Sequence, residues 1–550
     1  MNRGTAGAPT AHRFATAAVA TPHYLASHAG AAVLHQGGNA MDAAIAANLV
    51  LGVVAPYTCG IGGDCFAIVW DGDLHGYNGS GRAPAAATPA AVLDRLRPAT
   101  GPAVGLAAPR AGLLPVTVPK ADEAAGAPGQ VAMPRSGPLP ITVPGAVDAW
   151  FALLERFGSR SFAELVEPAA AYAENGFPLT AAGAARIAAG RPADPGWGDW
   201  PAIYGRSAPG TPLCQPDLAR TLRAAAAGGP DAFYRGEIAA AVADHVQRLG
   251  GFLDAADLAA HRGEWVRPLE GRYRDLTVAE LPPNSQGSAA LLALHLLDGA
   301  GPLPPDGPER HHRLIEAVAT ALAERDAHLT DPAHMRLPPD VLADPGRATA
   351  LAAHPAPPAT ARRGGGGDTA YLCAVDRSGL CVSLIQSNYN GFGSGVTVPG
   401  FGINLHNRGA YFSLDPDHVN VLAPAKRTLH TLMPALARRG GRPWLVFGTM
   451  GADGQLQTQV QLLARLVDDG ADPAAALAAP RWLVDPGDHS VRIESRFSPA
   501  VLDGLRRHGH RLDVLGGWED PMGHAHVIRI DGDGLTAASD PRCEGLAAGF

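Results

Sequence analysis

Residues 364–376 read Gly364-Gly365-Gly366-Gly367-Asp368-Thr369-Ala370-Tyr371-Leu372-Cys373-Ala374-Val375-Asp376. The glycine run indicates an accessible loop, and the apolar, β-prone residues that follow it indicate a buried strand. Thr369 therefore stands where a loop enters a sheet. An attack of its hydroxyl on the Asp368 carbonyl would turn the peptide bond into an ester, and hydrolysis of that ester would leave Thr369 as a new N-terminal residue.

A threonine released in this way carries both groups that acyl transfer needs. A free α-amine has a reference pKa of roughly 7.7–8, so it can serve as general base for the hydroxyl of its own residue. Taken alone, however, the pattern more often marks an ordinary surface loop that enters a sheet. The rest of the chain has to decide between self-cleavage and this simpler interpretation.

The composition is that of a folded protein with a large core. The chain has 550 residues, 46% of them hydrophobic and 17% charged, which allows two to four conventional domains or one large αβ unit with insertions. The formal net charge of −8 argues against a nucleic-acid or anionic-membrane partner. A small anionic substrate remains open, because a few arginines can override the overall charge locally.

The sequence predicts no targeting or membrane-spanning segment. The N-terminus lacks the apolar core of a signal peptide, and the longest apolar stretch, residues 43–56, is too short to cross a bilayer. The cysteines show no CxxC spacing, which favours reduced thiols, most of them buried. They are Cys59, Cys65, Cys214, Cys373, Cys381 and Cys543. We therefore expect a cytoplasmic protein.

Helical patterns separated by irregular segments dominate the chain before Thr369. A helix is expected to begin near Met41, and residues 218–249 predict two helices with a break at 228–230. Residues 98–140, rich in Pro, Gly and Ala, predict a long loop, and residues 353–367 predict an exposed linker.

After Thr369 the pattern changes to short strands followed by helices. The residues 376–379 between the first two strands have the composition of a hairpin turn. Strands are expected at 371–375, 380–385, 444–447 and 527–530, and helices at 457–467 and 473–478. This order suits an α+β fold of the four-layer αββα sandwich type.

Several separated motifs resemble the γ-glutamyltranspeptidase family of N-terminal-nucleophile hydrolases, from about residue 17 to about residue 530. The motifs before Thr369 are Gly37-Gly38-Asn39-Ala40-Met41-Asp42-Ala43-Ala44, Gly60-Ile61-Gly62-Gly63-Asp64, Gly81-Arg82-Ala83-Pro84, Val143-Pro144-Gly145, Ala232-Phe233-Tyr234-Arg235-Gly236 and Leu281-Pro282-Pro283. Those after it are Phe392-Gly393-Ser394-Gly395, Asn407 and Gly448-Thr449-Met450-Gly451. Their common order makes the resemblance specific.

The resemblance implies roles for individual residues. Thr369 falls at the family's nucleophile, so the cleavage site is the bond between Asp368 and Thr369. Ser387 falls at a hydroxyl that orients the nucleophile. Gly451 and Ala452 fall where a Gly-Gly pair supplies backbone N–H groups to the oxyanion, and alanine offers the same N–H.

The substrate-binding positions match the family only in part. Arg82 matches the arginine that grips the substrate carboxylate, a task for which a guanidinium is well suited. Where the family recognises the glutamyl α-amino group with polar or acidic side chains, this chain has Tyr389, Arg408 and Tyr411. A serine pair that helps to hold the carboxylate is His430-Thr431 here. These changes imply a pocket that retains carboxylate recognition and loses ammonium recognition.

Four local stretches are more similar to the oxamate amidohydrolase branch of the family. Oxamate is a small amide with a carboxylate and no amine, which agrees with the altered charge. The stretches are Asn390-Gly391-Phe392-Gly393-Ser394-Gly395, Asn407-Arg408-Gly409-Ala410, His430-Thr431-Leu432 and Gly451-Ala452-Asp453-Gly454-Gln455.

Simpler interpretations of the same residues remain open at this point. Arg82 could be an ion-paired surface arginine, Arg408 could pair with Asp453, and Ser387 could be an ordinary strand hydroxyl. His430 suits a structural role as well as a substrate contact. Three further motifs carry little weight. They are Gly60-Ile61-Gly62-Gly63, which lacks the lysine of a nucleotide loop, and the pairs His311-His312 and His524-Ala525-His526, which lack the companions of a zinc site.

We therefore predict a precursor that cuts itself into segments 1–368 and 369–550, which stay associated in one αββα core. The product is an N-terminal-threonine amidohydrolase acting on a small carboxylate-bearing amide through an acyl-enzyme, without metal or organic cofactor. The alternatives are a γ-glutamyltransferase or glutathione hydrolase, and an unprocessed, non-catalytic scaffold. Acyl donor, acceptor, further assembly and pathway are left open by the sequence.

Overall fold

The computed structural model describes residues 11–97, 131–353, 368–532 and 534–550. Most of the loop predicted over 98–140, and nearly all of the linker predicted over 353–367, lie outside the described residues. The Asp368–Thr369 bond lies within them.

Two seven-stranded sheets form the centre of the molecule, and neighbouring strands within each sheet run antiparallel. The first sheet has the order β21 (Leu546–Gly549), β2 (Ala18–Thr21), β10 (Asp368–Val375), β11 (Cys381–Tyr389), β3 (Asp64–Trp70), β4 (Leu74–Gly79) and β7 (Glu264–Val266). The second has the order β1 (His12–Phe14), β20 (Gly534–Ser539), β19 (Ala525–Asp531), β15 (Arg442–Thr449), β14 (Ala435–Arg439), β9 (Leu276–Glu280) and β8 (Leu269–Tyr273).

The two sheets pack face to face because one set of alternating side chains in their strands forms an apolar layer between the sheets. The other set is also apolar and packs under the outer helices. In β10, Tyr371, Cys373 and Val375 point between the sheets and contact residues of the second sheet such as Val446 and Ile528. The intervening residues of β10 point away from the second sheet, into the core beneath the outer helices. β10 is therefore buried on both faces.

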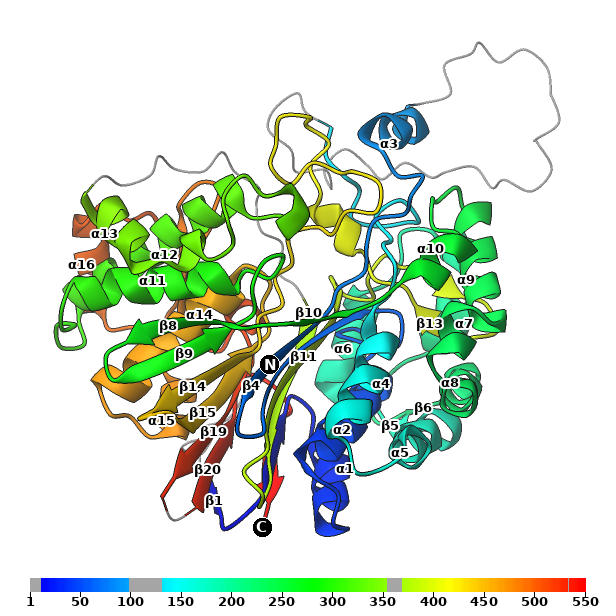
Figure 1. Ribbon diagram of the computed structural model, residues 1–550, viewed down its shortest axis with the longest axis horizontal. Helices are drawn as coiled ribbons and strands as arrows, with labels where there is room; N and C mark the ends of the chain where they lie inside the picture. The colour runs from blue at the N-terminus through cyan, green and yellow to red at the C-terminus, as the bar shows by residue number, and fades with distance from the viewer. Residues whose placement is uncertain (1–10, 98–130, 354–367, 533) are drawn as a thin grey trace.

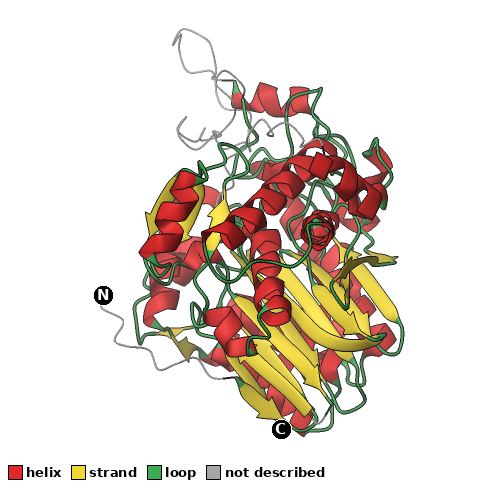
Figure 2. Ribbon diagram, turned by 90° about the vertical axis from the view of Figure 1, so that its left-hand side faces the viewer, coloured by secondary structure: helices red, strands yellow, loops and turns green. Residues whose placement is uncertain are grey.

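Helices cover the outer face of each sheet, so the molecule has four layers (Figures 1 and 2). The first sheet is covered by α1 (Tyr24–His35), α2 (Ala40–Val54), α4 (Ala146–Phe157), α5 (Phe162–Asn175), α8 (Pro216–Tyr234) and α9 (Glu237–Arg248). The second is covered by α11 (Gly287–Gly299), α12 (Pro308–His328), α14 (Gly454–Leu463), α15 (Pro473–Ala478) and α16 (Pro499–Arg507). The predicted αββα sandwich is confirmed.

The described residues also form five further α-helices and seven further strands. The helices are α3 (Pro89–Leu96), α6 (Ala181–Ala189), α7 (Trp200–Tyr204), α10 (Ala255–Ala260) and α13 (Pro345–Ala353). The strands are β5 (Phe177–Pro178), β6 (Pro212–Leu213), β12 (Thr397–Val398), β13 (Ile403–Asn404), β16 (Trp482–Val484), β17 (Val491–Glu494) and β18 (Leu512–Leu515).

Local sequence signals explain where several helices start and bend. The helix predicted near Met41 is α2, whose first turn is closed by a capping box in which Asn39 and Asp42 bond each other's backbone N–H. The break predicted at 228–230 is a kink at Gly229 (φ 65°, ψ −161°), after which α8 continues to Tyr234. Pro230 is tolerated there because it follows the kink, where its missing N–H breaks no helical bond.

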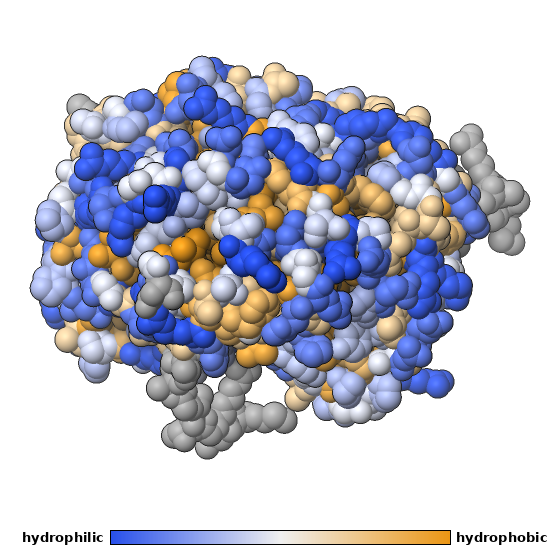
Figure 3. Space-filling view, turned by 60° about the horizontal axis from the view of Figure 1, so that its bottom comes forward, coloured by the Kyte–Doolittle hydropathy of each residue, from blue (hydrophilic) through white to orange (hydrophobic). Residues whose placement is uncertain are grey.

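The face drawn in Figure 3 is mostly hydrophilic. Figure 3 shows the face at the bottom of Figure 1, where apolar surface gathers near the centre and hydrophilic residues surround it. Each of the six cysteines is a free thiol. Within the described residues, none of the helices is long and apolar enough to cross a membrane.

Candidate active site

Thr369 and Ser387 face each other on the neighbouring strands β10 and β11. Thr369 Oγ1 donates a hydrogen bond of 3.0 Å to Ser387 Oγ, which in turn donates one of 2.9 Å to the carbonyl oxygen of Asp368. The backbone N–H of Tyr389 donates to the same Ser387 Oγ at 2.7 Å. The register of the β10–β11 pair shifts between Asp368 and Ala370, so a bulge or irregularity interrupts the strand pairing at Thr369. Ser387 therefore contacts both the hydroxyl and the carbonyl that would react in self-cleavage.

The side chain of Asp368 is held by a cation and by a backbone N–H. Its Oδ1 lies 3.2 Å from Arg186 Nη1, and its Oδ2 accepts a bond of 3.1 Å from the N–H of Gly391. Arg186 also pairs with Asp520, which His524 bonds at 2.8 Å. Burial raises the pKa of the Asp368 carboxyl, and the Arg186 charge opposes that rise. The residue before the candidate cleavage site is thus fixed on both carboxylate oxygens.

Gly451 and Ala452 lie between the end of β15 and the start of α14. Both have positive φ, 129° at Gly451 and 48° at Ala452, so two successive peptide units turn together. Among the described residues, no acceptor is recorded for either backbone N–H. The Ala452 side chain is buried beside Tyr389 and Ala410. Two free N–H groups at such a turn are what an oxyanion site requires.

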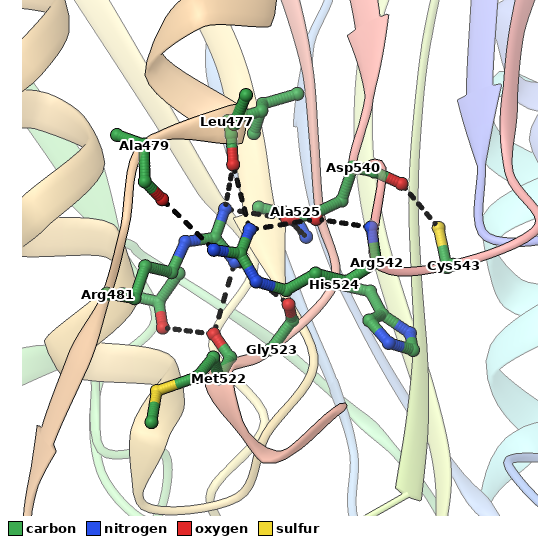
Figure 4. A network of polar contacts seen from close by, with 12 residues as sticks. Leu477, Ala479, Arg481, Met522, Gly523, His524, Ala525, Asp540, Arg542 and Cys543 are labelled. Carbon is green, nitrogen blue, oxygen red and sulfur yellow. Dashed lines mark hydrogen bonds and ion pairs between the residues drawn. The ribbon is translucent and has the colours of Figure 1, made fainter. Parts of the chain in front are cut away.

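A buried network of arginines holds the loop that packs against Gly451 (Figure 4). Arg481 Nη1 donates to the carbonyls of Met522 and Gly523 at 3.1 and 2.8 Å, and its Nη2 pairs with Asp540 at 2.6 Å. Burial alone would raise the pKa of the Asp540 carboxyl, but two neighbouring guanidiniums hold that pKa well below its usual range. A Cβ built on Gly451 would lie 3.6 Å from the Gly523 Cα, so this network fixes the backbone beside the turn.

Arg408 is buried and only partly satisfied. It begins a short 3₁₀ turn (Arg408–Tyr411) and is 1% exposed. Its Nη1 donates to Thr431 Oγ1 at 3.2 Å, and its guanidinium lies 4.4 Å from the centre of the Tyr389 ring. Within the described residues, neither Nε nor Nη2 has a hydrogen-bond acceptor. Burial lowers the pKa of the guanidinium. Such a group favours an anionic ligand.

The acid suggested as a partner for Arg408 is bound elsewhere. Asp453 Oδ1 pairs with Arg325 at 2.6 Å and accepts a short bond from the Tyr411 hydroxyl. The same Arg325 donates to Gln286 Oε1 at 2.7 Å, and Gln286 Nε2 donates to the carbonyl of Ala452 at 3.1 Å. The alternative pairing of Arg408 with Asp453 is therefore wrong in this structure.

His430 is structurally satisfied on both ring nitrogens. Its Nε2 lies 3.0 Å from Asp64 Oδ2, and its Nδ1 accepts the N–H of Leu432 at 3.2 Å. Burial lowers the pKa of His430 to about 3, so the ring is neutral. Asp64 pairs with Ser387 in the β3–β11 register, and its side chain also approaches His406. The geometry therefore favours the structural interpretation of His430.

Arg82 lies beside two acidic side chains. Its guanidinium pairs with Asp331 at 3.2 Å and Glu264 at 3.1 Å, and it donates to the carbonyl of Ala425. The side chain is 40% exposed. Among the described residues, no recorded contact joins Arg82 to Thr369. Thr369 is bonded to Ser387, and Ser387 accepts the N–H of Tyr389. The Tyr389 ring in turn lies against Arg408 and Ala452. In the described part of the chain, no comparable contact links Arg82 to this group.

Sequence reasoning missed Arg186, Gln286, Arg325 and Asp64 as parts of the site. Arg186 and Arg325 lie in helical patterns without any local signal. Asp64 and Gln286, in contrast, belong to or adjoin the Gly-rich and Pro-Pro motifs that carry the family resemblance. These motifs could have indicated a buried support for the strand that carries Ser387.

One hollow in the described surface lies away from these residues. Its volume is about 500 Å³, and residues of α1 and α5, among them Ala32, Pro168 and Tyr172, line it. None of the predicted site residues contributes to it. The candidate active site is therefore defined by the hydrogen bonds around Thr369 and not by this hollow.

An αββα sandwich with a threonine at the start of a central strand defines the class of N-terminal-nucleophile hydrolases. The family model for Gamma-glutamyltranspeptidase matches residues 26–122 and 120–550. The chain belongs to this family, whose curated relatives here are proenzymes that include hydrolases of amide bonds.

Three similar proteins narrow the comparison. The chain is 38% identical to the Glutathione hydrolase-like YwrD proenzyme of Bacillus subtilis, over 97% of this chain and 98% of the relative. It is 37% identical to the Oxamate amidohydrolase proenzyme of Klebsiella pneumoniae, over 96% and 97%. The crystal structure of cephalosporin acylase from Bacillus halodurans superposes with a TM-score of 0.88 at 35% identity, covering 100% of this chain and 98% of that one.

Proposed function

We propose that the protein cuts itself between Asp368 and Thr369, and that Thr369 then hydrolyses a small amide that bears a carboxylate and no ammonium group, as oxamate does. Segments 1–368 and 369–550 would remain one particle, because β10 pairs with β2 of the first segment and with β11 of its own. The Thr369–Ser387–Asp368 chain of hydrogen bonds supports the cleavage step.

Turnover follows from the same groups once the α-amine of Thr369 is free. The amine takes the proton of the Thr369 hydroxyl, and the oxygen attacks the amide carbon of the substrate. The N–H groups of Gly451 and Ala452 bind the oxyanion, and the amine passes the proton to the leaving nitrogen, which departs as ammonia. Water then attacks the acyl ester, and a carboxylic acid leaves. Removal of one oxyanion donor typically lowers kcat by about 10²–10³.

The observation that carries the substrate class is the incomplete bonding of Arg408. Two of its nitrogen atoms, Nε and Nη2, form one edge of the guanidinium and have no acceptor in the described residues. A carboxylate matches that edge with two parallel hydrogen bonds. Arg408 contacts Tyr389 and Thr431, and Tyr389 in turn contacts Ser387 through its backbone and Ala452 through its side chain. A small substrate could therefore bridge Arg408 and Thr369.

The surrounding charges disfavour a substrate ammonium. Asp453 is the nearest acid to Tyr411, and its charge is matched by Arg325. Arg408 adds a second buried cation, which repels an ammonium at this position. This arrangement favours an oxamate-like amide over a γ-glutamyl compound. Arg82 is already paired with Asp331 and Glu264, so a substrate carboxylate at Arg82 would compete with these two acids.

The test compares two substrates on one preparation. Purified protein is assayed for ammonia release from oxamate and for anilide release from a γ-glutamyl anilide, with Thr369→Ala as the inactive control. We expect oxamate turnover that exceeds γ-glutamyl turnover. The reverse preference would overturn the substrate class and leave the nucleophile intact.

Electrophoresis of the same samples tests the nucleophile separately. Wild-type protein should run as two bands, and Thr369→Ala as one full-length band that remains folded. Two bands from Thr369→Ala would assign the cut to another residue, whatever the substrate.

A further inference from the structure

We propose that His312, Glu316 and His510 form a binding site for a divalent transition metal of the zinc type. The site lies in the outer helical layer that covers the second sheet, where α12 and α16 pack together (Figure 1). Taken as single motifs, the histidines of this region lack companions of a metal site. The fold supplies the companion from a segment 198 residues further along the chain.

The three donor atoms converge on one point. His312 Nδ1 lies 2.9 Å from His510 Nε2 and 4.0 Å from Glu316 Oε1, and His510 Nε2 lies 3.9 Å from the same oxygen. The equidistant point that lies in the plane of these three atoms is about 2.1 Å from each of them, and zinc binds imidazole nitrogen and carboxylate oxygen at about 2.0–2.2 Å. An ion thus fits between the donor atoms without a change of backbone.

The local structure fixes the positions of the two imidazoles and leaves the carboxylate free to move. His312 and Glu316 stand one turn apart on α12, so they share a face of the helix. His510 follows the end of α16, and its N–H donates to the carbonyl of Leu505 at 3.1 Å. The His510 side chain is 8% exposed and that of His312 28%, whereas Glu316 is 60% exposed. The imidazoles are therefore largely fixed before an ion arrives, and the carboxylate can move to meet it.

A further imidazole supports the arrangement. The His508 ring stacks on His312, with 4.2 Å between ring centres and 10° between planes. Its Nε2 lies 3.6 Å from Glu309, whose carboxylate also bonds Arg313 at 2.8 Å. The charge of Glu309 is thus partly matched, and Glu316 supplies the negative charge for the site.

The ligand set selects the kind of metal. Two imidazoles and one carboxylate suit zinc and its neighbours in the first transition series, whereas calcium and magnesium prefer oxygen ligands. With three protein ligands, a fourth position is left to water.

The position of the site indicates a structural rather than a catalytic role. His312 and Arg325, which supports the Ala452 turn, stand about 20 Å apart along α12. A bound ion would join α12 to the loop between α16 and β18.

Metal binding is tested on the full chain without a histidine tag, after dialysis against a chelator. Cobalt(II) or zinc(II) alone is titrated, and binding is followed by visible absorption and by calorimetry. We expect one saturable site per chain. His510→Ala and Glu316→Ala should each weaken it by at least about 10-fold, and His334→Ala, which removes an exposed histidine from another part of the surface, should leave it unchanged.

Thermal unfolding gives a second readout. Saturating zinc should raise the Tm of wild-type protein and of His334→Ala more than that of Glu316→Ala, because an ion that binds only the folded state stabilises it by mass action. Glu316 is exposed, so its loss does not threaten folding. Equal affinity in all variants would mean adventitious surface binding and would overturn the proposal, as would the lack of saturable binding in wild-type protein.

Discussion

Arg186 Nη1 lies 3.2 Å from Asp368 Oδ1, so a cation from α6 binds the residue that immediately precedes Thr369. The contact fixes the Asp368 side chain while Ser387 bonds the carbonyl of the same residue. Together the two contacts restrain the peptide bond that is proposed to break. If this bond is cut as proposed, the pair would act before the cut, because the cut would separate Asp368 from Thr369.

Replacement of Arg186 by Gln should slow self-cleavage by about 10- to 100-fold, because a poorly positioned carbonyl is attacked slowly. The decay of the full-length band on denaturing gels measures this rate. Turnover per processed molecule should change less, since cleavage separates Asp368 from Thr369. Arg191→Gln is the control, because Arg191 is an exposed arginine that follows the same helix. Cleavage at the wild-type rate in Arg186→Gln would contradict the assigned role.

Arg408 and Arg82 make different predictions for the binding of the substrate carboxylate. Arg408→Lys loses the planar edge that matches a carboxylate, so KM should rise by at least about 10-fold, the effect of losing about 1.4 kcal/mol of a charged hydrogen bond. Arg82→Lys keeps a charge beside Asp331 and Glu264 and should have a smaller effect. Steady-state kinetics with one substrate decides between them. A larger effect from Arg82→Lys would mean that Arg82, and not Arg408, binds the substrate carboxylate.

The turn at Ala452 predicts which substitutions the oxyanion site tolerates. Ala452 has φ 48°, a conformation that glycine adopts freely and that β-branched residues resist. Ala452→Gly should therefore retain activity, whereas Ala452→Val should lower kcat by about 10²–10³ if the N–H turns away. Both variants should first be checked for cleavage and for native circular dichroism. Full activity of Ala452→Val would show that this N–H does not bind the oxyanion.

Buried neutral histidines should make the protein sensitive to acid. Burial lowers the pKa of His526 from its ordinary 6.5 to about 3, and its Nδ1 bonds Ser539 Oγ at 2.8 Å. Between these two pH values His526 is protonated in the unfolded chain and neutral in the folded chain. The free energy of unfolding therefore falls as the pH falls from 6.5 toward 3.

His526→Gln should remove one such group and reduce the slope of the unfolding free energy by about 1.4 kcal/mol per pH unit within this window. Urea unfolding at a series of pH values measures the slope. His334→Gln, at an exposed position, should leave it unchanged. A slope in His526→Gln equal to that of wild-type protein would mean that the group titrates normally in the folded state.

The sequence predicted those parts of the fold that depend on local patterns. The helix over 473–478 matches α15, and the strand over 371–375 lies within β10, because capping residues and runs of apolar residues are local signals. The predicted break at 228–230 is confirmed, because the backbone leaves helical geometry at Gly229 and two helical stretches meet there. The strand expected at 380–385 continues to Tyr389, since its polar residues are buried by tertiary contacts rather than exposed in a turn.

The charged partners of the site could not be read from spacing. Arg186 is separated from Asp368 by 182 residues, and His430 from Asp64 by 366. No periodicity or turn signal connects such pairs, since only the packing of the layers brings them together. The free edge of Arg408 was equally hidden, because its availability depends on Asp453 being bound by Arg325.

The location of β10 limits what happens to the two segments after a cut. The strand is hydrogen-bonded on both sides and buried on both faces, so pulling it out means dismantling both cores. Segments from different molecules should therefore not exchange under native conditions. In a mixture of wild-type and inactive protein, each particle would keep the two segments that came from one precursor chain.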